Sequence, residues 1–306
     1  MSNNNKTSLI YHMLYESSIV SVYDYRCRAG RGGPTVDEYS NINNIVLMRH
    51  GAFCKHFGRR SVTADVNQAV FFSKGSTYRI SHPADCGDRG TIFAASPRLL
   101  KDIIYELDPS IQERPEQPFP FVLGPCAAGI FWRHRELVQR LEAAQSEPLE
   151  PLWADVTALQ LIADILEAAF AQQGLPRKRR RNGTDDDHID RAEAAKTYLA
   201  SRLCERITLD DVASAVYSSP FHLARVFHER TSMPLHRYLT QLRLRASLEQ
   251  LTAGAKDLTE LALELGFSSH SHFADVFRRE FGHTPSDVRR NASQRTLCEM
   301  SKNLKV

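Results

Sequence analysis

The sequence predicts an α+β protein with a β-rich N-terminal part and an all-α C-terminal part. Three observations favour this division. In residues 9–96, short segments rich in Val, Ile, Phe and Tyr alternate with clusters of Gly, Asn and Asp, as strands alternate with turns. In residues 127–172, apolar residues recur at helical spacing. In residues 189–290, one helical pattern occurs twice, beginning at Thr208 and again at Asp257.

The N-terminal part is expected to form a β-sandwich or a barrel, because short strands follow one another at regular spacing. A helix is expected over residues 97–107, since Pro97 suits the first turn of a helix. The clearest strand candidates are Ile45–Arg49, Ala69–Ser73, Tyr78–Ser81 and Thr91–Ala95.

Two amphipathic helices are expected next, at Ala127–Gln145 and Pro151–Gln172. The second helix has an apolar stripe that either packs on its own domain or forms a contact between two copies of the chain, and spacing alone does not decide between them. These helices complete an expected first domain, 1–173. The stripe consists of Leu152, Val156, Leu159, Ile162, Ala163, Leu166 and Phe170.

A linker is expected at 174–188, where Gly, Pro and five basic residues precede three aspartates. Such a charge run is usually only solvated, although beside a DNA-binding domain it can also touch phosphates. Charge gives no stronger indication of nucleic acid, because the net charge is +3 and residues 208–290 carry equal numbers of basic and acidic residues.

Each repeat has the pattern of a helix-turn-helix unit. The first helix of each unit opens with an N-cap residue that an acid follows three positions later, Thr208 with Asp211 and Asp257 with Glu260. A small alanine inside each first helix allows the second helix to cross closely. These alanines are Ala213 and Ala262.

The second helix of each unit is expected to begin at Ser219-Pro220 and near Ser269, after short turns. One long helix, Leu235 to Leu251, joins the two units. The two polar-faced second helices can then enter successive major grooves on one side of a duplex, which recur about every 34 Å. Inward positions are Leu223, Val226 and Phe227 in the first unit and Phe273, Val276 and Phe277 in the second.

The C-terminal third resembles the arabinose-regulator (AraC/XylS) family. The stretches that carry the resemblance are VASAVYSSPFHLARVFHERTSM, RYLTQLRLRASLEQL and ELALELGFSSHSHFADVFRREFGHTPSDVRR. The resemblance implies a DNA-binding domain at 189–291 followed by a tail at 292–306. It also implies an N-terminal cupin-like β-barrel that holds a small-molecule effector, dimerisation helices, and RNA polymerase as a partner.

Two residues depart from the family pattern. Ser232 stands where a glycine usually ends the first recognition helix, and a serine with positive φ there costs up to about 1 kcal/mol. Asp275 stands where many members carry arginine. An acid repels phosphate but can accept a hydrogen bond from cytosine, so the second unit is expected to read bases differently or to rest mainly on the DNA backbone.

The residues expected to bind double-stranded DNA lie on the second helices. Phe221 would touch a thymine methyl and Arg225 would bond a guanine, although Phe221 can instead pack on the connecting helix and Arg225 can pair with Glu229. His222 shares this polar face. On the second unit the candidates are His270, Ser271 and Asp275. Phosphate contacts are expected from Ser219, Ser269, Arg237, Arg243 and Arg278.

The sequence does not locate an effector pocket. Aromatic or polar strand residues such as Arg49, Phe71, Phe72, Tyr78 and Phe93 are more often core or surface residues than ligand contacts. No metal, cofactor or catalytic residue is expected, because the N-terminal histidines (His50, His56 and His82) are isolated in the sequence and lack the paired pattern of metal-binding cupins.

Two alternatives stay open. One is a regulator that senses redox state through Cys54, Cys86 or Cys126, which would require a lowered thiol pKa; the other is a cupin enzyme. The six cysteines are scattered without a CxxC pair, as free thiols are. The polar start of the chain and the lack of a long apolar run predict a cytoplasmic protein with no membrane partner.

Overall fold

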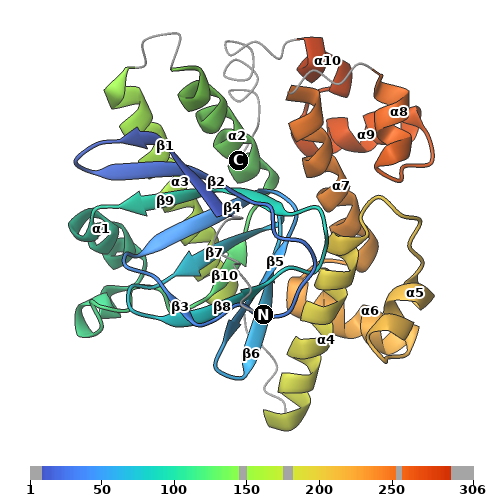
Figure 1. Cartoon of the computed structure of the whole chain (residues 1–306), viewed down its shortest axis with the longest axis horizontal. Helices are drawn as coiled ribbons and strands as arrows, with labels where there is room; N and C mark the ends of the chain where they lie inside the picture. Colours follow the sequence, from blue (N-terminus) through green and yellow to red (C-terminus); the bar gives the residue numbers. More distant parts are fainter. Residues whose placement is uncertain (1–8, 145–149, 175–181, 253–256, 291–306) are drawn as a thin grey trace, which may run out of the picture.

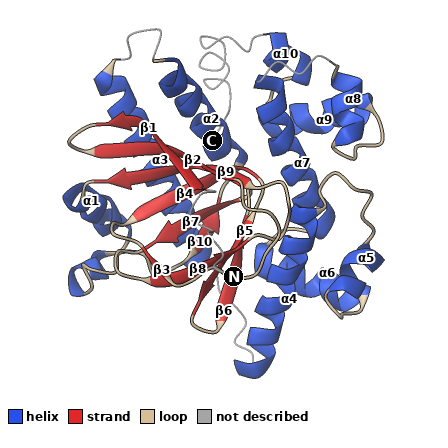
Figure 2. Cartoon of the chain, in the orientation of Figure 1, coloured by secondary structure: helices blue, strands red, loops and turns tan. Residues whose placement is uncertain are grey.

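The computed structural model describes residues 9–144, 150–174, 182–252 and 257–290. The N-terminal part is built from two antiparallel sheets, as expected from its composition (Figure 2). The larger sheet has the order β1 (Leu9–Glu16), β2 (Val20–Cys27), β9 (Asp88–Ala95), β4 (Asn44–His50), β7 (Gln68–Phe72) and β10 (Leu123–Pro125). The smaller sheet has the order β3 (Glu38–Tyr39), β8 (Thr77–Ser81), β5 (Phe53–Phe57) and β6 (Arg60–Ala64).

Helices α2 (Ala128–Ala143) and α3 (Pro151–Gly174) lie against the larger sheet, whereas α1 (Pro97–Leu107) packs on α3 and on the 3₁₀ turn η2 (Pro109–Glu113) that follows it (Figure 1). The expected apolar stripe of α3 divides in two. Ile162 and Leu166 are buried in the domain core, whereas Leu152 and Val156 are exposed. Packing on its own domain therefore accounts for only part of the stripe.

The larger sheet presents two different faces, because successive strand residues point to opposite sides. On one face, Asp24 of β2 and Arg49 of β4 meet α2 through Glu142. On the other face, Tyr25 of β2 and Val46 of β4 line a cavity. Strand β2 thus contributes Tyr25 to the cavity and Asp24 to the face that the helices cover.

The C-terminal part is all-α within the described residues. α7 (Leu235–Thr252) runs between two helix groups, with α4, α5 and α6 at one end and α8, α9 and α10 at the other (Figure 1). Helix α4 begins at Asn182, inside the stretch expected to be a linker, whereas the Arg177–Arg181 run and the tail 292–306 lie outside the described residues. The remaining bounds are α4 (Asn182–Ser201), α5 (Leu209–Ala215), α6 (Pro220–Thr231), α8 (Leu258–Glu264), α9 (His270–Phe281) and α10 (Pro285–Arg290).

The local signals that predicted the two helix-turn-helix units are confirmed. Thr208 and Asp211 form a complete capping box at the start of α5. The Asp257 carboxylate accepts from the backbone N–H groups of Thr259 and Glu260 at the start of α8. Ala213 and Ala262 are fully buried where the second helices cross. The inward residues are buried as expected, except that Val276 is only partly buried.

Candidate nucleic-acid interface and effector cavity

The first recognition helix, α6, exposes an aromatic surface. The Phe221 side chain is 81% exposed, so it does not pack on the connecting helix. Tyr217, in the turn just before α6, is 95% exposed. Tyr217 is not among the residues predicted from sequence to bind DNA, although an aromatic residue in a turn beside a recognition helix is itself a signal. Exposed aromatic rings of this kind can meet thymine methyl groups.

Arg225 follows Phe221 by one turn of α6 and is held in a short polar chain. Its guanidinium donates to the Glu229 carboxylate at 3.3 Å and lies 3.3 Å from His222 Nδ1. The expected alternative, a pair with Glu229, is therefore present in this state. Both side chains of the pair are 40% exposed, so water screens the pair and DNA can compete for the arginine.

His222 differs from the expectation, because it faces the protein. Its Nε2 lies 2.9 Å from Arg191 of α4, and its ring packs on His188 of the same helix. We therefore assign His222 to the packing of α6 on α4 and not to base contact.

The second recognition helix, α9, has an exposed face of different chemistry. Ser271, Asp275 and Arg278 are exposed, while His270 is half-buried at the first position of the helix. Arg237, at the start of α7, is also exposed. This face combines one acid with basic and hydroxyl groups, and it lacks the aromatic pair of the first unit.

Ser219 and Ser269, both expected to contact phosphate, are N-caps. Ser219 Oγ accepts from the N–H of His222, and Ser269 Oγ accepts from the N–H of His272. Both serines are exposed, and each hydroxyl still has a hydrogen to donate. Both therefore remain able to contact phosphate.

Arg243 does not have the role expected from sequence. Its Nε donates to Leu203 O at 2.7 Å, Nη2 to Glu205 O at 2.6 Å and Nη1 to Gly266 O at 2.9 Å. These carbonyls belong to the segment before α5 and to the turn of the second unit. The half-buried guanidinium therefore joins the two units and is not available as a phosphate contact.

The β-rich domain binds α7 through a network of six charged side chains. Arg49 donates to Asp24 at 2.9 Å, to Glu142 at 3.0 Å and, across the domain boundary, to Glu249 of α7 at 3.0 Å. Arg135 of α2 donates to the other Glu249 oxygen at 2.8 Å. Arg89 of β9 completes the network through Asp24 and Glu142.

These six side chains are balanced in charge, with three arginines and three carboxylates, and the exposed Arg26 lies 3.6 Å from Asp24 at the edge of the network. Burial alone would raise the pKa of Glu249, but the charges of Arg135 and Arg49 outweigh it and hold that pKa below its usual value. Glu249 therefore stays ionised. Removing it would leave Arg49, which is almost fully buried, with less compensation, and such losses are strongly destabilising.

Further contacts, including those of three large side chains, fix the helical part on the β-rich domain. Arg245 of α7 is buried, and its guanidinium donates to Val66 O and to Cys126 O. The Tyr238 hydroxyl donates to the buried Asp65 carboxylate at 2.6 Å. Trp132 of α2 packs on Phe281 of the second unit, with ring centres 5.6 Å apart. The domain thus contacts both the connecting helix and one of the units it joins.

A cavity of about 910 Å³ opens on the other face of the larger sheet, between it and the smaller sheet. This volume is within the range of small-molecule sites. Of the strand residues considered from sequence, Phe72 and Tyr78 line it, Phe71 and Phe93 lie in the core, and Arg49 belongs to the ion network.

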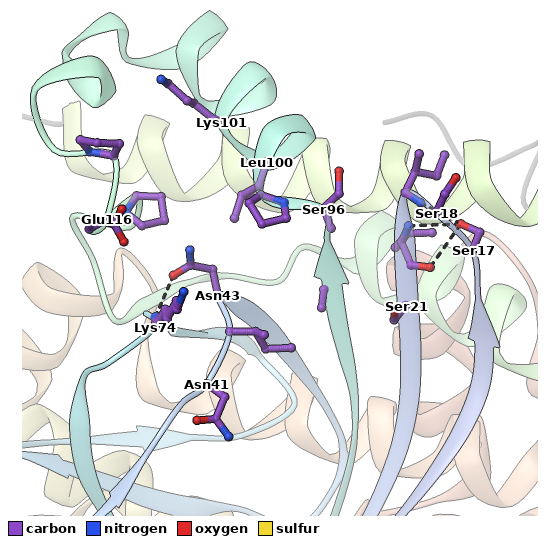
Figure 3. A pocket seen from close by; sticks show the side chains of 18 of the residues that line it. Ser17, Ser18, Ser21, Asn41, Asn43, Lys74, Ser96, Leu100, Lys101 and Glu116 are labelled. Atoms are coloured by element: carbon purple, nitrogen blue, oxygen red, sulfur yellow. Dashed lines mark hydrogen bonds between the residues drawn. The ribbon is translucent and has the colours of Figure 1, made fainter.

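A smaller pocket of about 460 Å³ lies near the N-terminal end of α1 (Figure 3). Ser17, Ser18 and Ser21 lie on one side of it, and Asn43 and Lys74 on another. On β2 it is lined by Val20, Ser21 and Tyr23, whereas the larger cavity is lined by Tyr25 and Cys27.

The thiols considered as redox sensors have the wrong electrostatics for that role. Burial raises the pKa of Cys54 and of Cys86, and it raises the pKa of Cys126 to about 11. A raised pKa disfavours the reactive thiolate. The redox alternative is therefore not supported at these three residues.

The comparisons with known proteins agree with this geometry. A helix-turn-helix domain family matches residues 212–291. The transcriptional activator RhaS of Escherichia coli O1:K1 is 27% identical over 255 residues, which are 83% of this chain and 87% of RhaS. The corresponding RhaS of Shigella dysenteriae serotype 1 is 22% identical over the same shares.

Two solved structures are similar with low TM-scores. Apo ToxT from Vibrio cholerae strain SCE256 is 11% identical and matches 90% of this chain and 99% of its own, with a TM-score of 0.37. A regulator from Chromobacterium violaceum with an AraC-type DNA-binding domain is 26% identical over 37% of this chain and 98% of its own, with a TM-score of 0.33.

Two matched helix-turn-helix units on one connecting helix, together with the RhaS similarity, define a DNA-binding transcription regulator. Its sequence is similar to members of the AraC/XylS family. None of the described helices has the length and apolar character needed to cross a membrane.

Proposed function

We propose that this regulator recognises a specific DNA sequence and that a small molecule in the larger cavity sets its affinity for that DNA. The proposal rests on the observation that the same strands have residues in the cavity and in the ion network. On β2, Tyr25 lines the cavity and Asp24 holds the network; on β9, Asp88 lines the cavity and Arg89 holds the network. A shift of either strand therefore reaches Glu249 on α7.

In DNA binding, α6 and α9 would occupy successive major grooves. Phe221, Tyr217 and Arg225 would contact bases from the first unit, and Ser271 and Asp275 would face bases from the second. Arg237, Arg278 and the two N-cap serines would contact phosphates. The exposure of these side chains supports this assignment.

A cavity-filling variant tests the effector control without knowledge of the effector. Ile92→Trp and Val46→Phe should each change DNA affinity about tenfold, the usual size of an allosteric coupling, and Glu249→Gln should abolish the difference. The affinity would be measured by fluorescence anisotropy with a duplex selected from a random library. Ser21→Phe, which fills the smaller pocket, is the control. Unchanged affinity in the folded cavity variants would contradict the proposal.

We also propose that the chain forms a homodimer through the exposed part of α3. We further propose that the two sheets together form the cupin-type barrel of the family. Leu152 and Val156 are 66% and 57% exposed on α3 although both are large and apolar, which supports the first part. Sedimentation of the full chain should show a dimer, and Val156→Glu should convert it to a monomer. A wild-type monomer at micromolar concentration would contradict the dimer.

RNA polymerase is the proposed partner in activation, because the RhaS relatives are named transcriptional activators. Transcription in vitro from a promoter that carries the selected site should rise when the protein is added. No change, or repression, would contradict activation.

A further inference from the structure

Three side chains with metal-binding atoms converge at the wall of the larger cavity. Cys27 Sγ lies 3.3 Å from His82 Nε2, and Asp88 Oδ2 lies 3.0 Å from the same nitrogen. The sulfur, nitrogen and oxygen atoms all lie within 4.8 Å of one another. No spacing pattern predicts this cluster, because Cys27 is far along the chain from His82 and Asp88.

Hydrogen bonding alone does not account for the arrangement. His82 Nε2 carries at most one hydrogen, which cannot point at both the thiol and the carboxylate. Asp88 is only 4% exposed, and within the described part of the chain its Oδ2 receives no hydrogen bond of ordinary geometry. A protonated His82 would pair with this oxygen at 3.0 Å. With a neutral His82, a buried carboxylate oxygen without such a donor is costly unless another cation compensates its charge. A cation among the three atoms would do so.

The scaffold holds the three residues in place from both sheets. Cys27 and Asp88 are directly paired across β2 and β9. At Gly87, φ is +65° and a Cβ atom would lie 2.3 Å from Cys27 O, so only glycine allows these two segments to approach so closely. His82 follows β8 of the smaller sheet, and its carbonyl accepts from Gly32 N–H at 3.1 Å.

We propose that Cys27, His82 and Asp88 bind a divalent transition-metal ion, and that Zn²⁺ is the best match. Zinc takes thiolate, imidazole and carboxylate ligands at about 2.0–2.3 Å, which places tetrahedral ligand atoms about 3.5 Å apart. The separations of 3.3 Å and 3.0 Å from His82 Nε2 are close to this value. The mixed sulfur, nitrogen and oxygen set disfavours Mg²⁺ and Ca²⁺, which prefer oxygen alone. Thiolate and carboxylate together would neutralise the ion.

Three protein ligands leave one tetrahedral position open, as in zinc sites that exchange a ligand. All three residues line the larger cavity, so the open position is accessible from it. This further step rests on the proposed function: an effector with a carboxylate or thiolate group would complete the coordination. Because Arg89 follows Asp88 on β9, coordination at Asp88 bears directly on the ion network.

Cobalt provides a direct test, because Co²⁺ occupies zinc sites and a thiolate ligand gives a charge-transfer band in the near ultraviolet. Reduced, chelator-treated full-length protein should bind one equivalent of Co²⁺ with this band, and Zn²⁺ should displace it. Cys27→Ser should abolish the band, and His82→Gln should weaken Co²⁺ binding about tenfold or more. Cys54→Ser and Cys86→Ser are matched controls that should keep both the thiolate band and the affinity for Co²⁺.

No thiolate band in the wild type, or a band that survives Cys27→Ser, would overturn the site. Circular dichroism of each variant separates loss of a ligand from loss of the fold. DNA binding is measured on the same samples with and without Zn²⁺. DNA binding that persists while the band is absent refutes the metal site alone, whereas a cobalt band without any sequence-specific DNA binding refutes the proposed function alone.

Discussion

The two helix-turn-helix units differ at the two positions where the backbone is left-handed. In the second unit both are glycines, Gly266 in the turn with φ 76° and Gly282 after α9 with φ 75°. In the first unit the equivalent residues are Tyr217 with φ 50° and Ser232 with φ 56°. A residue other than glycine in this region costs up to about 1 kcal/mol, so the first unit folds under strain that the second avoids.

Strain of this kind is retained where the side chain has another use. Tyr217 is almost fully exposed in the turn before α6, so its ring adds little to the core and is open to contact with DNA. The second unit has relaxed turns and an acid, Asp275, on its recognition helix. We infer that the first unit is specialised for reading bases and the second for positioning the protein on the duplex.

Gly266→Ala should have the largest effect on stability among the changes that test this contrast. The alanine would have to adopt φ 76°, and its Cβ would lie 2.7 Å from Nη2 of Arg243, the side chain that joins the two units. We expect a loss of about 2 kcal/mol or more in the free energy of unfolding, measured by urea denaturation. Tyr217→Ala, which keeps a Cβ in place, should change it little. Equal losses would remove the distinction between the turns.

Phe221→Ala and Asp275→Ala should change DNA affinity in opposite directions. Loss of the exposed ring should weaken binding to the selected duplex about tenfold, which corresponds to about 1.4 kcal/mol. Loss of the acid should strengthen binding a few-fold, because phosphate repulsion falls. Anisotropy titrations measure both. If Asp275→Ala weakened binding more than Phe221→Ala, the second unit would be the principal reader.

Replacing the serine after α6 by glycine, and the glycine after α9 by serine, should change the stability of the protein in opposite directions. Both effects should be smaller than that of Gly266→Ala. Ser232→Gly should stabilise the protein by about 0.5–1 kcal/mol, and Gly282→Ser should destabilise it by a similar amount. A Cβ at Gly282 meets no atom within 4 Å, so backbone conformation alone is tested there. Thermal unfolding of the two variants gives the signs; the same sign for both would contradict the explanation.

Acid should weaken the second unit more than the first, as the smallest of these effects. Backbone hydrogen bonds from Glu260 and Thr259 lower the pKa of Asp257, so its contribution is present above its unfolded value of 3.8 and is lost as pH falls through the lower folded value. The Thr208 hydroxyl, which does not titrate, still caps α5 when Asp211 is protonated.

NMR titration of the first-turn amides of α5 and α8 below pH 4 compares the two caps. Asp257→Asn keeps a capping oxygen and should remove the pH dependence at α8, while Asp211→Asn serves as the matched change at α5. Equal acid sensitivity of the wild-type α5 and α8 would count against the difference.

The parts of the fold that could be predicted from sequence are those set by local interactions. Capping at Thr208 and Asp257 and the helical spacing around Phe227 and Phe277 depend on neighbours within one or two turns. Short strands such as β4 and β7 were also recognised from their composition. The residues within each of these segments determine its secondary structure.

The site residues that were misjudged depend on distant contacts. Arg243 looks like a surface arginine on α7 until the chain folds and brings Leu203 O and Gly266 O to it. His222 likewise depends on α4. Strand register pairs Cys27 with Asp88 and sheet packing adds His82, so no spacing in the sequence could show that cluster.

Selection of DNA from a random-duplex library tests the central claim most directly, because the claim is that one chain reads two adjacent major grooves with the first unit as principal reader. The wild type should recover two conserved blocks about one helical turn apart. Phe221→Ala and Arg225→Ala should each relax the block read by α6 and leave the other block in place. A single block, or relaxation of the opposite block by these changes, would contradict the account.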